Sequence, residues 1–108
     1  MPPKTTMEEE EQSRLNEELI VALYHEESAD YIRALIEEGA DVNADDEGGS
    51  SALHLAVENN APAIVRLLIE RGARLNTLNE HGWTPLRCAA VEGREECARL
   101  LLTAGGKP

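Results

Sequence analysis

A period of 33 residues runs through the sequence, and this internal repeat constrains the fold more than any other feature. Shifting the chain by 33 positions places Gly49 on Gly82, Leu53 on Leu86, and residues 66–68 on 99–101. The same shift aligns the segments GADVN and GARLN, and three copies fill the chain from about residue 14. Repeats of this length indicate a small structural unit that stacks on its own copies.

Each copy carries the signals of two short helices. Ser51 and Thr84 precede apolar runs and are placed to cap a first helix, and Pro85 occupies a first-turn position that tolerates proline. The second helix has apolar residues at i, i+3 and i+4 and ends at a glycine, Gly72 or Gly105. The predicted unit is helix, turn, helix and polar loop.

One such unit cannot bury its leucine face alone. Stacking the copies side by side buries that face, which contributes roughly 1.5–3 kcal/mol for each fully buried leucine. About three copies are the minimum for independent stability, and the sequence has that number. We therefore expect an all-α solenoid of about three helix-turn-helix repeats with hairpin-like loops.

The segments GWTPLRCAAVEG, ALHLAVENN and IEEGADVNA resemble ankyrin repeats, whose unit of about 33 residues carries the element T-P-L-H-x-A. Ala52 replaces the usual proline of this element and Arg87 the usual histidine, and the first copy has lost the element and the hairpin glycine. The expected organisation is an acidic, disordered tail over 1–13, a degenerate N-terminal capping repeat over 14–44, a repeat over 45–78, and an incomplete C-terminal repeat over 79–108.

The charge of the chain is strongly negative and unevenly distributed. The net charge is −11, and residues 1–47 hold 15 acidic and 3 basic side chains while residues 48–108 hold 6 and 7. Such a field disfavours nucleic acids and anionic lipids and favours a protein partner with a basic surface. No stretch approaches the roughly 18 apolar residues of a membrane span, and we expect a soluble protein of the cytoplasm or nucleus.

The histidines and cysteines tempt a catalytic or metal-binding interpretation, which their spacing does not favour. His25 and His81 have no metal-like i, i+4 partner, Cys88 and Cys97 match no zinc spacing, and no nucleophile has a recognisable base partner. We expect no catalytic residue, cofactor or metal, and two cysteines that pack in the core, with a redox or dimer role as the alternative. The ankyrin resemblance implies that His54 links one loop to the next.

The ankyrin resemblance also implies a binding surface, because partners of the family usually lie along the concave face. At the hairpin tips this face would carry Asp45, Glu47, Ser50, Leu78, Glu80, His81 and Trp83. On the first helices it would carry His25, Glu26, Glu58, Asn59, Val91 and Glu92. Trp83 is the candidate anchor, since aromatic residues dominate binding hot spots. The alternative is that its indole only packs on the neighbouring hairpin.

Two residues are candidate modification sites. Asn43, with Leu35, Asp41 and Val42, resembles the ankyrin segment that oxygen-dependent asparaginyl hydroxylases modify, and the alternative is that Asn43 bonds its own turn. Thr6 precedes a run of glutamates typical of acidophilic-kinase sites, and TMEE is equally typical of a capping box.

The favoured function is that of a non-enzymatic module that binds a basic protein partner on its concave face, as small ankyrin proteins do when they regulate or inhibit assemblies. The alternatives are an acidic escort chaperone for a basic client, and an ankyrin targeting fragment of a larger protein or effector. For the oligomeric state we expect a monomer, or weak self-association through the last repeat.

Overall fold

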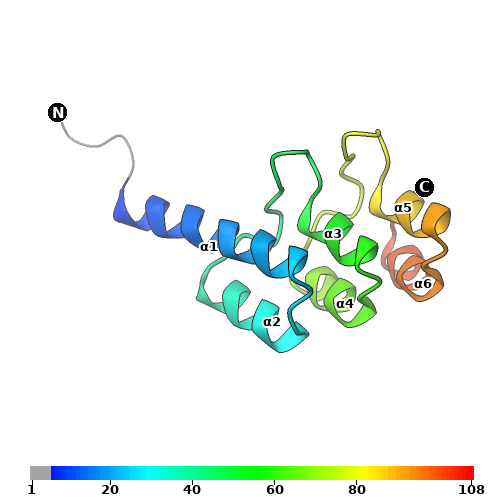
Figure 1. Cartoon of the computed structure of the whole chain (residues 1–108). Coiled ribbons are helices and arrows are strands. Elements are labelled where there is room, and N and C mark those ends of the chain that lie inside the picture. Colours follow the sequence, from blue (N-terminus) through cyan, green and yellow to red (C-terminus); the bar gives the residue numbers. More distant parts are fainter. Residues whose placement is uncertain (1–5) are drawn as a thin grey trace.

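Three helix pairs stand in a row in the computed structural model, which describes residues 6–108 (Figure 1). Part of the predicted tail, residues 1–5, lies outside the described residues. The helices are α1 (Met7–Tyr24), α2 (Ala29–Glu38), α3 (Ala52–Glu58), α4 (Pro62–Glu70), α5 (Pro85–Glu92) and α6 (Glu95–Ala104). The all-α repeat fold predicted from the sequence is confirmed.

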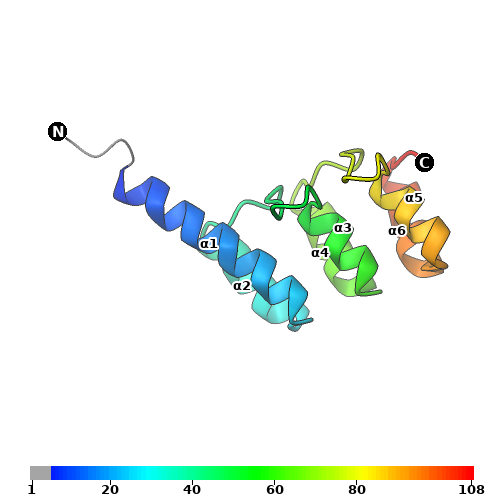
Figure 2. The ribbon, with the colours of Figure 1, turned by 45° about the horizontal axis from the view of Figure 1, so that its top comes forward.

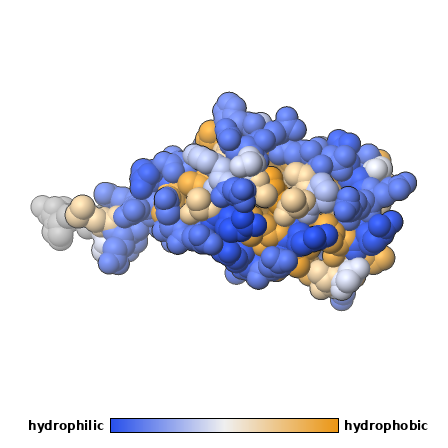
Figure 3. All heavy atoms as spheres, turned by 90° about the horizontal axis from the view of Figure 1, so that it is seen from below, coloured by the Kyte–Doolittle hydropathy of each residue, from blue (hydrophilic) through white to orange (hydrophobic). Residues whose placement is uncertain are grey.

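The pairs are arranged in two layers, with the first helix of each pair in one layer and the second helix in the other (Figures 1 and 2). Helix α3 packs on both α1 and α5, and α4 packs on both α2 and α6. Loops rise before α3 and before α5, on the same side of the stack. Seen from below, the face of the second helices mixes hydrophilic surface with smaller hydrophobic areas (Figure 3).

Capping residues and glycines delimit the helices as the sequence predicts. The hydroxyl oxygens of Ser51 and Thr84 each accept a hydrogen bond of 3.2 Å from the backbone N–H three residues later. Gly72 and Gly105 follow α4 and α6 with φ angles of 85° and 104°, in the left-handed region that glycine adopts without strain. These predicted helix boundaries are confirmed.

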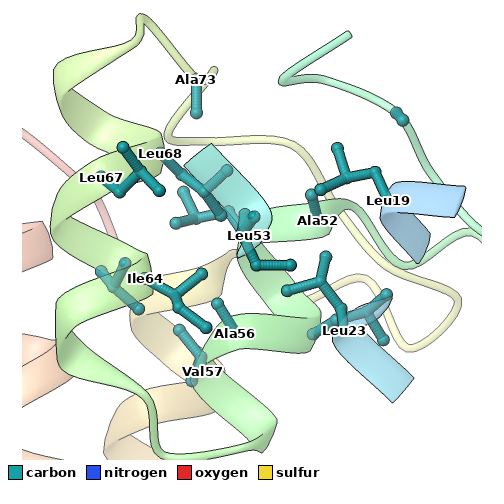
Figure 4. Close-up of a cluster of buried hydrophobic side chains, with 14 of the residues drawn as sticks. Leu19, Leu23, Ala52, Leu53, Ala56, Val57, Ile64, Leu67, Leu68 and Ala73 are labelled. Atoms are coloured by element: carbon teal, nitrogen blue, oxygen red, sulfur yellow. The ribbon is translucent and has the colours of Figure 1, made fainter. Parts of the chain in front are cut away.

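The core lies between the pairs and is built almost entirely from aliphatic side chains. Leu19 and Leu23 of α1 meet Leu53 and Val57 of α3, and Leu68 of α4 closes the cluster from the second layer (Figure 4). All five side chains are buried. The aliphatic face of each pair is therefore covered by the next pair.

The predicted disordered tail over 1–13 is wrong from Met7 onward, where α1 begins. Thr6 caps this helix with its hydroxyl oxygen, 3.1 Å from the backbone N–H of Glu9, and glutamates in the first turn are favourable at the positive end of a helix dipole. Gln12 fixes the helix to the stack by donating a 2.6 Å hydrogen bond to the carbonyl of Gly39. The capping role considered for Thr6 is confirmed, and its phosphorylation stays a prediction.

Asparagine side chains tie each loop to the following repeat. The carboxamide oxygens of Asn43 and Asn76 accept hydrogen bonds of 2.8 Å from the backbone N–H groups of Arg74 and Lys107. Within the first repeat, the carboxamide oxygen of Asn16 on α1 accepts a 2.7 Å hydrogen bond from the backbone N–H of Asp41, in the loop that follows α2. Directional bonds thus hold the register between neighbouring copies in addition to apolar burial.

His54 is fully buried and joins α3 to the next loop. Its Nε2 lies 2.8 Å from the carbonyl oxygen of Trp83, and its Nδ1 lies 2.7 Å from the hydroxyl oxygen of Ser51. Because a carbonyl only accepts, Nε2 carries the proton and Nδ1 accepts. Burial lowers the pKa of His54, although the bond to Trp83 opposes that shift. The linking role predicted for this histidine is confirmed.

Replacing this side chain should destabilise the whole stack. We expect His54→Ala to lower the free energy of unfolding by about 2–4 kcal/mol, because it leaves a cavity and removes one of the two hydrogen bonds to the Trp83 carbonyl, the other coming from the Asn79 backbone N–H. Urea denaturation at pH 7 measures the loss. An exposed residue of the second layer, Arg66, offers the control variant Arg66→Ala, and an equal loss in both variants would contradict the structural role of His54.

The buried histidine should also make stability depend on pH. A folded-state pKa below the ordinary value of 6.5 means that the unfolded chain takes up the proton first. The stabilisation by neutral His54 is thus fully present above pH 6.5 and is lost as the pH falls toward the folded-state pKa. Urea denaturation at several pH values should show this loss in the native chain and not in His54→Gln. Parallel pH profiles would contradict the prediction.

Candidate functional site

The two loops that rise from the stack are built alike and lie next to each other. An Asp46 carboxylate oxygen accepts the backbone N–H of Ser50 at 2.8 Å, and the Asn79 amide oxygen accepts that of Trp83 at 3.1 Å. A Cβ atom on Gly49 in the first loop would lie 3.7 Å from the backbone nitrogen of Glu80 in the second. The loops therefore present a joint edge along one side of the stack.

Trp83 is half-buried at the base of the second loop. Its ring packs against the core cluster, lies 5.5 Å from the ring of His81, and has the guanidinium carbon of Arg87 5.6 Å from its centroid. Both backbone polar groups of Trp83 are used within the protein, by Asn79 and by His54. The side chain thus has a packing role, and part of its ring surface stays open to solvent.

Three carboxylates surround Glu58 closely enough for their charges to act on it, and we call the four the acidic face: Asp46, Glu58, Glu80 and Glu92. Burial raises the pKa of Glu58, and the charges of Glu92, Asp46 and Glu80 raise it further, while His81 acts in the opposite direction. A positive charge placed here would relieve repulsion that the folded chain itself creates.

Asp46 connects the first loop to α1. The hydroxyl group of Tyr24 donates a short hydrogen bond to its carboxylate, 22 residues away along the chain. Burial alone would raise the pKa of Asp46, but bonds from Tyr24 and from the backbone N–H groups of Ser50, Gly48 and Gly49 lower it overall. The same bond and burial raise the pKa of Tyr24. Asp46 is therefore held as a carboxylate. Neither Asp46 nor Tyr24 was predicted from the sequence as a site residue.

The structure distributes the predicted binding residues unevenly. Seven of them are exposed on the loops or near the helix ends that follow them, where a partner can reach them: Asp45, Glu47, Leu78, Glu80, His81, Val91 and Glu92. Ser50 is only partly exposed, and Glu58 is exposed at the end of α3. Of this group, the structure brings Glu80, His81 and Glu92 within charge range of Glu58, and His81 next to Trp83.

Three predicted positions differ from expectation. His25 and Glu26 were placed on a first helix, but α1 ends at Tyr24, His25 is its C-cap, and Glu26 has a φ of 54° in the turn. Asn59 is the C-cap of α3 and donates a 2.5 Å hydrogen bond to the carbonyl of Leu23. That bond makes Asn59 a link between neighbouring pairs rather than a free contact residue.

The local hydrogen bond suggested for Asn43 runs through a different side chain. An Asp41 carboxylate oxygen accepts the Asn43 backbone N–H at 2.8 Å, and the Asn43 carboxamide oxygen accepts from Arg74 in the next repeat. The interpretation that the Asn43 side chain bonds its own turn is therefore wrong. Hydroxylation of Asn43 stays a prediction.

The cysteines and histidines of the described part of the chain belong to no metal-binding cluster. Over residues 6–108, no group of three or more His, Cys, Asp and Glu side chains is arranged to hold a metal ion. Cys88 and Cys97 are free, buried thiols on α5 and α6, and burial raises the pKa of both. None of the described helices is long and apolar enough to span a membrane.

Comparison with known proteins agrees with the architecture. A family model for ankyrin repeats, in three copies, matches residues 19–108, and a search of curated proteins gives no significant match. Ankyrin repeats are generally protein–protein interaction modules, and the family is typically non-enzymatic. The match spans most of the chain and includes five of the six helices in full. On this evidence, the chain belongs to the ankyrin-repeat family.

Proposed function

We propose that the chain is a non-enzymatic module that binds a protein partner with a basic surface, and that it does so on the concave face formed by the two loops and the first helices. The mutual repulsion within the acidic face carries this proposal. Burial and the charges of Glu92, Asp46 and Glu80 raise the pKa of Glu58, so negative charge from both loops and from α5 gathers around this side chain. A basic partner would replace that repulsion with attraction.

The charge of the whole chain supports the same partner. The net charge of −11 draws a positively charged protein toward the surface before contact, which mainly raises the association rate. Salt screens this attraction over about 8–10 Å at physiological ionic strength. The proposed complex should therefore form more slowly and bind more weakly as salt is added.

Trp83 supplies the apolar contact in this proposal. It is half-buried, so its ring is already held in place by the core and by Arg87, and little conformational entropy is lost when a partner covers it. Ordered aromatic residues of this kind are typical hot spots. His81, next to the ring, and Glu80 complete the contact on the second loop.

Truncating Trp83 should weaken binding without unfolding the chain. The partner is first captured from cell lysate and purified. We expect Trp83→Ala to weaken binding to this partner by about 2 kcal/mol or more, which raises the Kd roughly 30-fold. Tyr31→Ala is the matched control, because Tyr31 is an exposed aromatic residue of the second layer. Calorimetric titration of each variant measures the change. Equal affinity of both variants for the partner would contradict an anchor at Trp83.

Removing charge from the acidic face should make binding less sensitive to salt. We expect the double variant Glu58→Gln/Glu92→Gln to bind the same partner several-fold more weakly at low salt, with a shallower salt dependence. The control Glu95→Gln/Glu96→Gln removes the same charge from the start of α6. If both double variants lower the affinity equally, the net charge of the chain alone determines binding and the acidic face has no special role. An affinity that does not respond to salt would contradict a basic partner.

A further inference from the structure

Helix α1 differs from the other first helices in length. It has 18 residues, whereas α3 and α5 have 7 and 8. The ankyrin match begins at residue 19, so the preceding part of α1, about three turns, lies outside the repeat pattern. This part projects beyond the end of α2 (Figures 1 and 2). Residues 7–18 of α1 thus extend the first layer beyond the matched repeats.

A groove of about 820 Å³ separates α1 from the loop over residues 45–50, and its α1 side combines three large, mainly apolar side chains with Asn16 and Glu17. Ile20, Val21 and Tyr24 line it, and Val21 and Tyr24 are 51% and 58% exposed. The Tyr24 hydroxyl is bound to Asp46, which fixes the ring against the loop. Apolar surface left open in a hollow is typical of an interaction site.

The polar lining of the same groove carries a single sign of charge. Glu17 stands on the α1 side, and Asp45, Asp46 and Glu47 stand on the loop side. No lysine, arginine or histidine is among the residues that line it. Hydrogen bonds lower the pKa of Asp46 despite its burial, so its charge persists inside the groove. An incoming cation would meet carboxylates from both walls.

A second hollow on α1 provides a contrast. It has about 370 Å³, lies between α1 and α2, and mixes Arg14 and His25 with carboxylates such as Glu18 and Glu27. Arg14 already pairs with Glu18 at 2.9 Å. Glu17 and Val21 line both hollows. The charges of the second hollow are partly satisfied by its own basic residues, whereas Asp45, which lines only the groove, has no ion pair among the described residues.

We propose that the groove between α1 and loop 45–50 binds a segment of a protein partner that carries arginine or lysine beside an aliphatic residue. The aliphatic residue and the stems of the basic side chains would cover Val21 and Tyr24, while the charged heads would reach Glu17 and Asp45. The inference rests on the proposed function. It assigns the basic segment to the groove between α1 of the first repeat and the loop of the second, and leaves Trp83 to contact another part of the partner.

The test uses the full-length chain labelled with ¹⁵N and a synthetic peptide of arginine, leucine and glycine. Backbone amide signals of Ile20, Val21 and Gly48 should shift saturably during the titration. The double variant Glu17→Gln/Asp45→Asn should raise the Kd roughly tenfold or more. Glu95→Gln/Glu96→Gln, which removes the same charge from α6, should change it less than about twofold. An otherwise unchanged amide spectrum verifies that each variant is folded.

Three results would overturn the groove assignment. Signals that shift around Trp83 and Glu92 instead would place the peptide on the second loop, and the concave-face proposal would stand. Equal losses in both double variants would show that only net charge acts. A peptide with serine in place of leucine that binds equally well would exclude the apolar contact. The purified partner, measured against Trp83→Ala, decides the proposed function separately.

Discussion

The structure depends on burial of aliphatic faces between helix pairs. No pair covers its own leucines, and each pair gains its interior only when the next one packs on it, as Leu19 and Leu23 do against Leu53. Contacts therefore run between neighbours along the row and not across the whole chain. Stability in such a stack is close to a sum of neighbour terms, so the middle pair, packed on both sides, contributes most to cooperativity.

Polar bonds add precision to this apolar stacking. His54 and the asparagines at positions 43 and 76 each connect one repeat to the backbone of the next. Because these bonds set where each loop emerges, they also set the distances between the carboxylates that the loops carry. The acidic face is thus a product of the stack, since its members come from both loops and from two different helices.

The repeat pattern made most of the fold predictable and little of the first repeat. The capping residues Ser51 and Thr84 and the glycine stops Gly39, Gly72 and Gly105 recur every 33 residues, so one copy verifies another. The role of His54 has no second copy, because Arg87 stands at the equivalent position, and it was predicted from the ankyrin resemblance. Helix α1 has no such copy: its glutamates were interpreted as disorder, whereas the Thr6 cap and the bond from Gln12 to Gly39 stabilise a helix. The hydrogen bond between Tyr24 and Asp46 joins two residues whose types do not recur at the equivalent positions of the other copies. The 33-residue period therefore could not reveal it.

The two thiols lie in the last pair, which, like the first, packs against one neighbouring pair. Cys88 and Cys97 are buried and held protonated by their surroundings, so a thiol reagent can reach them only when α5 and α6 open. Local opening at the end of a stack needs less free energy than global unfolding. The rate at which a thiol reagent modifies the folded chain therefore measures how often the last repeat opens. A partner that holds the second loop against the stack would lower that rate.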